Sequence, residues 1–129
     1  MTHDLLAFVG GGNMASAIIG GLVAAGRPGR SILVIDPGEA QRAKLAAEHG
    51  VRTQAAADAA LAQAAMIVWA VKPQLFQAAA APCAEHVRGA LQFSVMAGIR
   101  SEAIVRATGS QRVVRSMPNT PALIGQGIA

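Results

Sequence analysis

Short apolar segments alternate along this chain with stretches that favour helices. The segments predicted as strands are Leu5–Val9, Ile32–Ile35, Met66–Val71, Leu91–Met96 and Arg112–Met117, with a weaker candidate at Val51–Thr53. The first two and Met66–Val71 are apolar throughout instead of alternating, which is typical of strands buried on both faces. Because helix-forming segments separate the strands, the sequence predicts an α/β fold with a doubly wound parallel sheet of about six strands, in three layers.

The predicted helices have recognisable ends. Asn13–Ala25 and Gly38–His49 are followed by Gly26 and Gly50, and glycine readily adopts the left-handed conformation that ends a helix. Further helices are predicted at Ala56–Ala64, at Gln74–Arg88, and from Ser101, as N-cap, to about Gly109. Pro73 fits the first turn of the Gln74–Arg88 helix, whereas Pro82 should kink or divide it.

Length and composition favour one globular domain of the cytoplasm. The 129 residues suffice for a single core. The longest large apolar run, Ala65–Val71, ends at Lys72 and is far too short to span a membrane, and no secretory signal pattern is present. Cys83 is the only cysteine, so the chain has no internal disulfide. We predict a cytoplasmic protein with no membrane segment and no metal site.

The positive charge of the chain does not predict nucleic-acid binding. The net charge is +4, from 11 basic and 7 acidic residues, but the basic residues are scattered and aromatic residues for base stacking make up only 3%. A small anionic ligand is the better match for this modest charge.

A glycine-rich turn follows the first predicted strand and opens the first predicted helix. It reads Gly10-Gly11-Gly12-Asn13-Met14-Ala15, a Gly-x-Gly-x-x-Ala pattern. The first glycine allows a tight turn, and Gly12 lets the backbone approach a pyrophosphate, which the N–H groups of the helix N-terminus can bind. This context predicts a Rossmann-like domain in which Gly10, Gly11, Gly12, Asn13 and Met14 bind a dinucleotide. The alternative is a turn that is merely flexible.

Asp36 ends the second predicted strand, 24 residues after Gly12. An acidic side chain at this place accepts hydrogen bonds from the adenosine ribose in NAD-binding sheets, and its charge would repel the 2′-phosphate of NADP. Arg42 lies six residues further on and could compensate this charge in part. The alternative is that Asp36-Pro37-Gly38 is only a turn before a helix. The predicted cofactor is therefore NADP(H) or NAD(H), with the choice left open.

Three further segments end predicted strands at the edge of the sheet where ligands of open α/β sheets bind. After Met66–Val71, Lys72 could face an anion or be a solvated lysine, and Pro73 fixes the backbone. The small residues of Met96-Ala97-Gly98 would allow a flat ring to approach. In Met117-Pro118-Asn119-Thr120-Pro121, the two prolines either hold Asn119 and Thr120 for a ligand or form a rigid exit from the sheet.

Four blocks of sequence are FVGGGNMA at 8–15, AVKPQ at 70–74, MAGI at 96–99 and RVVRSMPNTP at 112–121. In this order and spacing they resemble the N-terminal domain of the pyrroline-5-carboxylate reductases, the enzymes that make L-proline. The resemblance implies that Ala70, Val71, Lys72 and Pro73 line the nicotinamide half of the cofactor. Met96, Ala97 and Gly98 would also contact the cofactor, and Pro118, Asn119 and Thr120 would form a substrate-side loop.

This chain departs from the family pattern at two positions. Many members carry alanine where Met96 stands, which puts the width of the pocket in doubt. At Ala57 the family often has an asparagine near the adenosine, so a hydrogen bond is lost there unless Asp58 replaces it.

The resemblance implies an oxidoreductase that transfers hydride from NADH or NADPH to the C=N bond of 1-pyrroline-5-carboxylate, in the last step of proline biosynthesis. Residues 1–121 would be the NAD(P)-binding domain, and 122–129 would begin a connection to a C-terminal helical domain, absent here, with the substrate site and the homo-oligomer interface. We expect no catalytic residue in this chain and almost no activity of it alone. Two alternatives remain, another NAD(P)-dependent imine or hydroxyacid oxidoreductase and a stand-alone NAD(P)-binding module.

Overall fold

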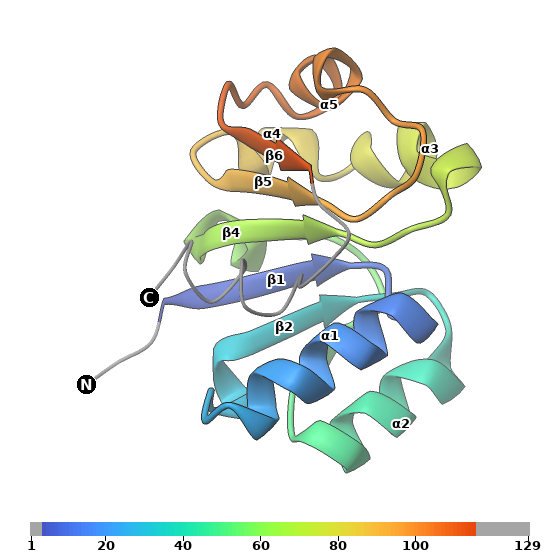
Figure 1. The fold of residues 1–129 in the computed structure, drawn as a ribbon, viewed down its shortest axis with the longest axis vertical. Coiled ribbons are helices and arrows are strands. Elements are labelled where there is room, and N and C mark those ends of the chain that lie inside the picture. Colours follow the sequence, from blue (N-terminus) through green and yellow to red (C-terminus); the bar gives the residue numbers. More distant parts are fainter. Residues whose placement is uncertain (1–3, 116–129) are drawn as a thin grey trace.

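A computed structural model describes residues 4–115, which form a six-stranded parallel sheet covered by helices on both faces (Figure 1). The strands are β1 (Leu5–Val9), β2 (Ile32–Ile35), β3 (Arg52–Gln54), β4 (Ala64–Trp69), β5 (Leu91–Ser94) and β6 (Val113–Arg115). Their order in the sheet is β3-β2-β1-β4-β5-β6, and all five pairings are parallel. The chain thus winds outward from β1 to one edge, returns to β4 beside β1, and winds to the other edge. The predicted doubly wound fold is confirmed.

The central strands are buried on both faces, as their continuous apolar sequence predicts. Successive side chains of β1 point to opposite faces, so that Leu6 and Phe8 join one core cluster while Ala7 and Val9 join the other. Leu6, Ala7 and Phe8 are fully buried. The core therefore consists of two layers of side chains with the sheet between them.

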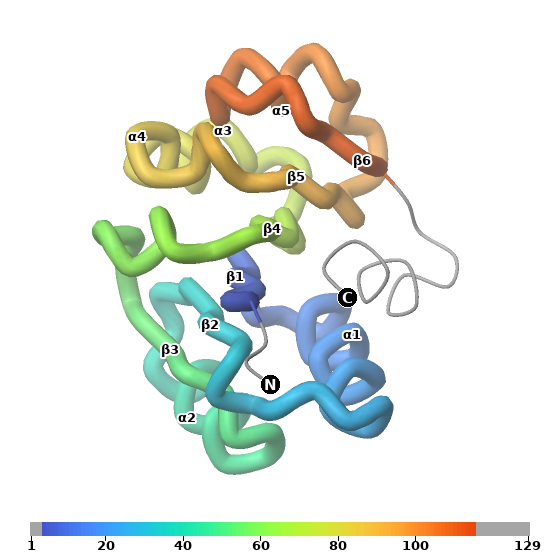
Figure 2. The backbone as a smooth tube through the Cα atoms, turned by 90° about the vertical axis from the view of Figure 1, so that its left-hand side faces the viewer, coloured from blue at the N-terminus to red at the C-terminus, as the bar shows by residue number. Residues whose placement is uncertain are grey.

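The helices and 3₁₀ turns form the two outer layers. They are α1 (Asn13–Ala24), η1 (Gly29–Ser31), α2 (Glu39–His49), η2 (Ala59–Gln63), η3 (Pro73–Leu75), α3 (Phe76–Ala80), α4 (Ala84–Val87) and α5 (Ser101–Thr108). Helices α1 and α2 supply the cluster that contains Leu6, whereas η2, α3, α4 and α5 supply the other. Figure 2 shows α1 on one side of the strands and α3 and α4 on the opposite side. No helix within residues 4–115 is both long and apolar enough to cross a membrane.

Several predicted helix boundaries are confirmed. Helix α1 ends at Ala24, two residues before Gly26, and α2 ends at His49, with Gly50 as its C-cap at a left-handed φ of 68°. Pro73 stands at the start of η3, and the segment after it divides around Pro82 into α3 and α4. Proline has no backbone N–H and its ring blocks the preceding turn, so this division follows from the sequence.

The predicted helix over Ala56–Ala64 is wrong. Only the 3₁₀ turn η2 forms there, because the side chain of Asp58 accepts a hydrogen bond from the N–H of Ala60 at 2.8 Å and starts a tight turn. Ala64 then pairs with Leu5, so that β4 begins before the predicted strand and ends at Trp69 instead of Val71. The alanine-rich composition of this segment favours a helix, and pairing with β1 overrides that preference.

Other boundaries differ by a few residues. The N-cap of α5 is Arg100, and Ser101 is the first helical residue with no capping hydrogen bond, contrary to prediction. Strand β5 ends at Ser94, two residues before the predicted Met96, because the hydroxyl of Ser94 accepts the N–H of Met96 at 3.1 Å in place of a neighbouring strand. Strand β3 lies one residue later than predicted. The predicted strand Arg112–Met117 is found from Val113, and its last two residues lie outside the described part of the chain.

Trp69 lies in the core, as predicted, and also takes part in a buried polar network. Its indole N–H donates to Oε1 of Gln92 on the adjacent strand β5 at 2.8 Å. Nε2 of Gln92 donates to the carbonyl oxygens of Val87 and Ala90 at 2.8 and 3.0 Å, and the hydroxyl of Ser110 also donates to Ala90. This network joins β4, β5 and the segments around α4 and α5.

Candidate functional site

A cavity of about 530 Å³ lies where the carboxyl ends of β1, β2 and β4 meet. It is lined by residues 9–12 after β1, by residues 35–37 after β2, by Ala55–Ala57 after β3 and by Ala70–Lys72 after β4. Leu75, Ala78, Ala79, Pro82 and Cys83 form its remaining wall. The order of the sheet reverses between β1 and β4, and ligands of open α/β sheets bind at such a point.

The glycine at the start of the turn is required by the fold itself. Gly10 has a φ of 103°, and a Cβ added there would lie 2.8 Å from the carbonyl carbon and oxygen of Ala70. Its N–H donates to the carbonyl oxygen of Ile35 at 2.9 Å, and the N–H of Ala70 donates to Val9 at 2.9 Å. Gly10 therefore lets the chain leave β1 while its backbone stays in close contact with the end of β2 on one side and with Ala70, after β4, on the other.

Gly12 differs, because neither its backbone conformation nor the described neighbours require a glycine. Its φ is −75°, which any residue adopts, and a Cβ added there would meet no described heavy atom within 4 Å. It is the N-cap of the twelve-residue helix α1 and makes no capping hydrogen bond with a side chain. The free N–H groups of this helix end, with open space beside Gly12, form a cradle suited to an anionic group.

The carboxylate of Asp36 is tied to the backbone on two sides. Oδ2 accepts the N–H of Gly11 at 2.9 Å, and Oδ1 accepts the N–H of Gly38 at 2.8 Å. The second bond is the turn that the sequence offered as an alternative, while the first places the carboxylate against the glycine-rich turn. The turn at Asp36 is therefore confirmed, while the binding of a ribose by Asp36 stays a prediction. Arg42 donates from Nη1 to the main-chain oxygen of Asp36 at 2.9 Å instead of pairing with its carboxylate.

The segment after β4 lines the cavity on the side opposite Asp36, with β1 between them in the sheet. Ala70, Val71 and Lys72 line it, and Lys72, whose side chain is exposed, is also the N-cap of η3. Asp36 and Lys72 are the two ionisable side chains, apart from the thiol, that line the cavity among the described residues. The lining is otherwise mostly apolar.

The structure brings together only part of the predicted site. Gly10, Gly11, Gly12, Asp36, Ala70, Val71 and Lys72 line the cavity. Asn13 and Met14 are the first two residues of α1; both are exposed, and neither lines the cavity. Pro73 lies in η3 and does not line the cavity either. Met96 is buried in the core beside Trp69, while Ala97 and Gly98 are exposed after β5. Pro118, Asn119 and Thr120 lie outside the described residues.

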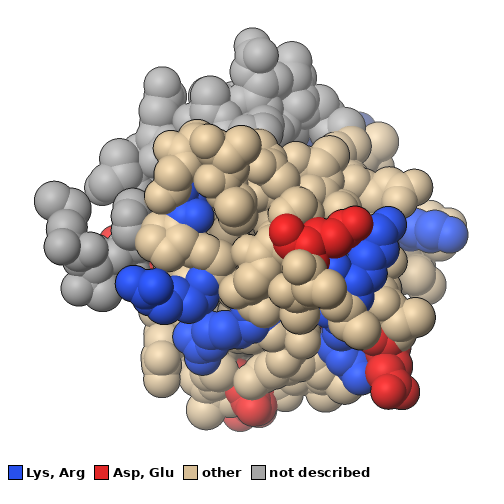
Figure 3. All heavy atoms as spheres, turned by 90° about the horizontal axis from the view of Figure 1, so that it is seen from below, with Lys and Arg blue, Asp and Glu red and all other residues tan. Residues whose placement is uncertain are grey.

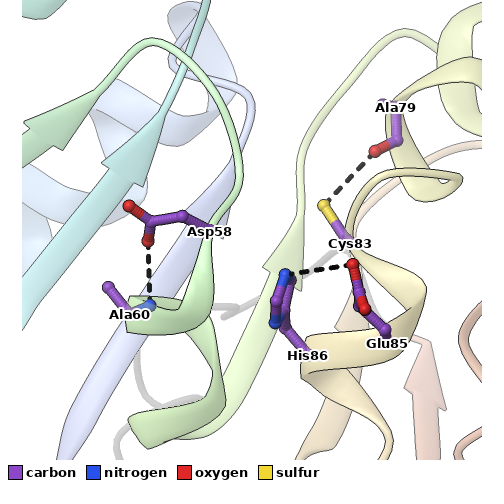
Figure 4. Close-up of polar contacts among 6 residues, drawn as sticks. All are labelled: Asp58, Ala60, Ala79, Cys83, Glu85 and His86. Carbon is purple, nitrogen blue, oxygen red and sulfur yellow. Dashed lines mark hydrogen bonds and ion pairs between the residues drawn. The ribbon is translucent and has the colours of Figure 1, made fainter.

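Sequence reasoning missed the wall formed by Leu75, Ala78, Ala79, Pro82 and Cys83. The only signal for it was Pro82, which breaks the helix and turns this segment back. Ala57 does line the cavity, but Asp58 does not line it. As Figure 4 shows, the Asp58 carboxylate instead holds the N–H of Ala60, so we find no sign that it replaces the polar side chain expected near the adenosine.

The surroundings of Cys83 disfavour the thiolate, the reactive form of a cysteine. Its Sγ donates to the carbonyl oxygen of Ala79 at 3.3 Å (Figure 4), and burial raises the pKa of the thiol to about 11. A thiol in this state is almost wholly protonated at neutral pH, and it is the thiolate that attacks electrophiles. The imidazole of the neighbouring His86 lies 3.6 Å from the Glu85 carboxylate, and the hydrogen bond that His86 makes to Cys83 runs from its main-chain N–H to the carbonyl oxygen, at 2.8 Å, and not to the thiol.

The surface charges show no continuous basic patch on the face in Figure 3, where Lys and Arg stand beside Asp and Glu. Within residues 4–115, no group of three or more His, Cys, Asp and Glu side chains could hold a metal ion. The cavity at the carboxyl ends of the strands, of about 530 Å³, is larger than a second cavity of about 260 Å³, which is lined by Gln77, Ala103, Arg106 and Ala107.

A doubly wound parallel sheet, with a glycine-rich turn at the point where its order reverses, defines a Rossmann-like domain. Residues 5–98 match the family described as NADP oxidoreductase coenzyme F420-dependent, and the chain belongs to this family.

Known proteins similar to the chain confirm the resemblance seen in the sequence. The chain is 42% identical to the pyrroline-5-carboxylate reductases of Haemophilus influenzae and Pseudomonas aeruginosa, and the two alignments cover 100% and 98% of the chain. A solved pyrroline-5-carboxylate reductase from Coxiella burnetii superimposes with a TM-score of 0.81 and 30% identity over 96% of the chain and 47% of that structure. The chain covers 48% and 47% of the two curated relatives, and so spans about half the length of each.

Proposed function

We propose that this chain is the NAD(P)H-binding part of a pyrroline-5-carboxylate reductase, which reduces the C=N bond of 1-pyrroline-5-carboxylate to form L-proline. The main support is the identity of 42% to reductases of that name over the whole chain. The cavity adds physical support, since its glycine-rich turn, helix N-terminus and carboxylate match the parts of a dinucleotide.

The residues of the cavity fit a dinucleotide in detail. Gly12 leaves open the space that a side chain would fill, so the diphosphate can approach the N–H groups of Asn13 and Met14. Asp36 accepts the ribose hydroxyls of the adenosine half. Ala70, Val71 and Lys72, which line the cavity, hold the nicotinamide half, and the exposed Ala97 and Gly98 after β5 lie at the same edge of the sheet outside the cavity lining. The bound cofactor supplies the hydride, and the chain supplies its position.

The substrate side is the less complete part of the proposal. Pro118, Asn119 and Thr120 follow β6 in sequence and would reach the nicotinamide from the carboxyl edge of the sheet. We propose that residues 1–121 are the cofactor domain and that 122–129 connect it to a region corresponding to the remaining half of the relatives. That region would bind the substrate carboxylate and form a homo-oligomer. A cytoplasmic location, with no role for nucleic acid or membrane, fits the composition.

Assay of the complete gene product tests the proposal. We expect oxidation of NADH or NADPH that depends on 1-pyrroline-5-carboxylate, with proline as the product. The 129-residue chain, assayed beside it, should bind a dinucleotide but form almost no proline. Activity with other cyclic imines or 2-hydroxy acids, and none with 1-pyrroline-5-carboxylate, would contradict the proposed substrate but not the proposed role of this chain as a cofactor domain.

The variant Gly12→Ala links this assay to the cavity. If the diphosphate lies against Gly12, a methyl group there should weaken dinucleotide binding in the isolated chain and raise KM for the cofactor in the complete protein. Unchanged binding would contradict the proposed position of the cofactor.

A further inference from the structure

We propose that Gln41 is a positioning residue for the dinucleotide, because it fixes the direction in which the glycine-rich turn presents the N–H of Gly12. Gln41 lies on α2 and does not itself line the cavity. It acts through the carbonyl oxygen of Gly11, a residue that does line it. The inference rests on the proposed function, which places the diphosphate of the cofactor at this turn.

Helix α2 reaches the glycine-rich turn with two side chains. Gln41 and Leu45 lie four residues apart and so share one face of α2. Nε2 of Gln41 donates to the carbonyl oxygen of Gly11, which lies 30 residues earlier in the chain. A Cβ added to Gly11 would lie 3.0 Å from Cδ1 of the fully buried Leu45. Gly11 is therefore packed against α2 by Leu45 and tied to it by Gln41.

Gly11 takes part in two peptide groups, and a side chain holds each of them. Its N–H donates to Oδ2 of Asp36 at 2.9 Å, and its carbonyl oxygen accepts from Gln41. Three successive glycines give this turn more conformational freedom than other residues would. The two hydrogen bonds offset this freedom, and the one from Gln41 holds the peptide group that joins Gly11 to Gly12.

The bond from Gln41 also sets the direction of the next donor. In a planar trans peptide the C=O and N–H groups point in opposite directions. Because the carbonyl oxygen of Gly11 faces Gln41, the N–H of Gly12 points away from it. Among residues 4–115 no acceptor takes up this N–H, and Gly12 is exposed and lines the cavity. The N–H is therefore available to an oxygen of the diphosphate, beside the N-terminus of α1.

Without this bond the same peptide group can turn over. It has a glycine on each side, and glycine tolerates backbone conformations that other residues avoid. In the reversed peptide the carbonyl oxygen of Gly11 would replace the N–H of Gly12 on the side of the ligand. An oxygen with a partial negative charge would then face the diphosphate, where a donor is needed. Gln41 thus favours the turn that binds an anion over the turn that repels one.

The side chain and its helix suit this role. The amide of Gln41 is uncharged, so its effect on the diphosphate runs through the peptide group and not through a charge of its own. The adjacent Arg42 donates to the main-chain oxygen of Asp36 at 2.9 Å. Consecutive residues of α2 therefore hold the turn after β1 and the turn after β2, which both line the cavity.

The variant Gln41→Met in the complete gene product tests the inference, because it keeps the length of the side chain and removes the donor. By calorimetry without substrate, we expect NADH and ADP to bind roughly tenfold more weakly. In the assay, KM for the cofactor should rise by a similar factor, while kcat and KM for 1-pyrroline-5-carboxylate stay within about twofold. Gln63→Met removes the same amide from an exposed position outside the cavity and should change none of these values.

A second variant, Gln41→Glu, gives a pH profile that a loss of packing would not produce. At neutral pH its carboxylate only accepts hydrogen bonds, so it does not hold the carbonyl oxygen of Gly11, and ADP should bind roughly tenfold more weakly or worse. The protonated acid donates again. As the pH falls toward the ordinary glutamate pKa of about 4.3, the affinity for ADP should approach that of the unaltered protein at the same pH.

The outcomes separate this inference from the proposed function. Unchanged affinity for NADH and ADP in Gln41→Met, or a constant deficit of Gln41→Glu at every pH, would overturn the role of Gln41 and leave the proposed function standing. A fall in kcat as large as the rise in the cofactor KM would also overturn it, since that result indicates a general structural role. Failure of the unaltered protein to bind NADH, NADPH and ADP would overturn both proposals together.

Discussion

The two halves of the sheet are built by different means. From β1 to β3, the helices α1 and α2 are 12 and 11 residues long, and the turns at the cavity are made by glycine and by backbone hydrogen bonds. From β4 to β6, α3 and α4 have only 5 and 4 residues, and buried polar side chains such as Gln92 hold the segments between them.

This difference matches the two tasks at the cavity. The first half presents the glycine backbone and open space, which a ligand can occupy, and Asp36 is its one ionisable side chain in the described lining. The second half forms an apolar wall whose position depends on side chains behind it. We therefore expect added atoms to lower the stability or ligand affinity of the first half, and removal of side-chain atoms to lower the stability of the second half.

The largest effect is expected at Gly10. Gly10→Ala forces an unfavourable φ and brings a Cβ within 2.8 Å of the Ala70 backbone, so the free energy of unfolding should fall by about 3 kcal/mol or more. Denaturant unfolding followed by circular dichroism measures it. Gly12→Ala is the matched control: alanine is a poorer N-cap than glycine but lowers the entropy of the unfolded chain, so the unfolding free energy should change by less than about 1 kcal/mol.

The same pair of variants separates folding from binding. If Gly12→Ala destabilised the chain as much as Gly10→Ala, then Gly12 would be a structural residue and the open cradle beside it would not exist. If instead its stability were normal and its dinucleotide affinity reduced roughly tenfold, the glycine would serve the ligand alone.

A somewhat smaller effect is expected at Gln92 in the second half. Gln92→Leu keeps the size of the side chain but leaves the indole N–H of Trp69 without its partner and removes the bonds from Nε2 to the carbonyl oxygens of Val87 and Ala90, so stability should fall by about 1 to 3 kcal/mol. Urea unfolding checks this value, with Gln63→Leu on exposed η2 as the control. A loss of less than about 0.5 kcal/mol would mean that the second half does not depend on buried polar contacts.

The sequence predicted the first half well because its signals are local. A glycine at a required position, a continuous apolar strand and an aspartate at a strand end each act within a few residues, and all were found. Between the two halves, at η2, the predicted helix was wrong, because the alanine composition favours a helix whereas Ala64 pairs with Leu5.

The second half could not be predicted to the same degree. The bond from Trp69 to Gln92 joins residues 23 apart, and nothing in the apolar run around Trp69 indicates a polar partner. Burial of Met96 and the apolar wall beside Cys83 depend likewise on how short helices pack, which local patterns do not encode. Of the site residues taken from the family resemblance, those directly after β4 line the cavity, whereas those after β5 do not.

Cys83 allows the chemical inertness of the wall to be measured. Burial raises the pKa of its thiol from 9.0 to about 11, so at pH 8 the folded chain should react with iodoacetamide roughly a hundredfold more slowly than the urea-unfolded chain. Equal rates in the two states would mean that the wall opens readily to solvent.

The same shift gives a pH dependence of stability with a definite sign. The unfolded thiol loses its proton near 9, whereas the folded thiol keeps it to about 11, so the free energy of unfolding should fall as pH rises through this range. Below pH 8 the thiol is protonated in both states and contributes no slope. Cys83→Ala should remove this part of the alkaline destabilisation, and a slope identical in both chains would contradict the assignment.

The smallest effect is expected at Gln54, the residue of the first half that departs from its pattern. Its Oε1 is buried without a hydrogen-bond partner among residues 4–115, although its main-chain oxygen accepts the N–H of Asp36 at 3.0 Å. An unpaired buried acceptor costs free energy, so Gln54→Met, of similar length, should raise the unfolding free energy by about 1 kcal/mol in the ligand-free chain. Gln63→Met, at an exposed position, should change it little. A loss of stability in Gln54→Met would show that the amide has a partner, and that the first half, like the second, relies on a buried polar side chain.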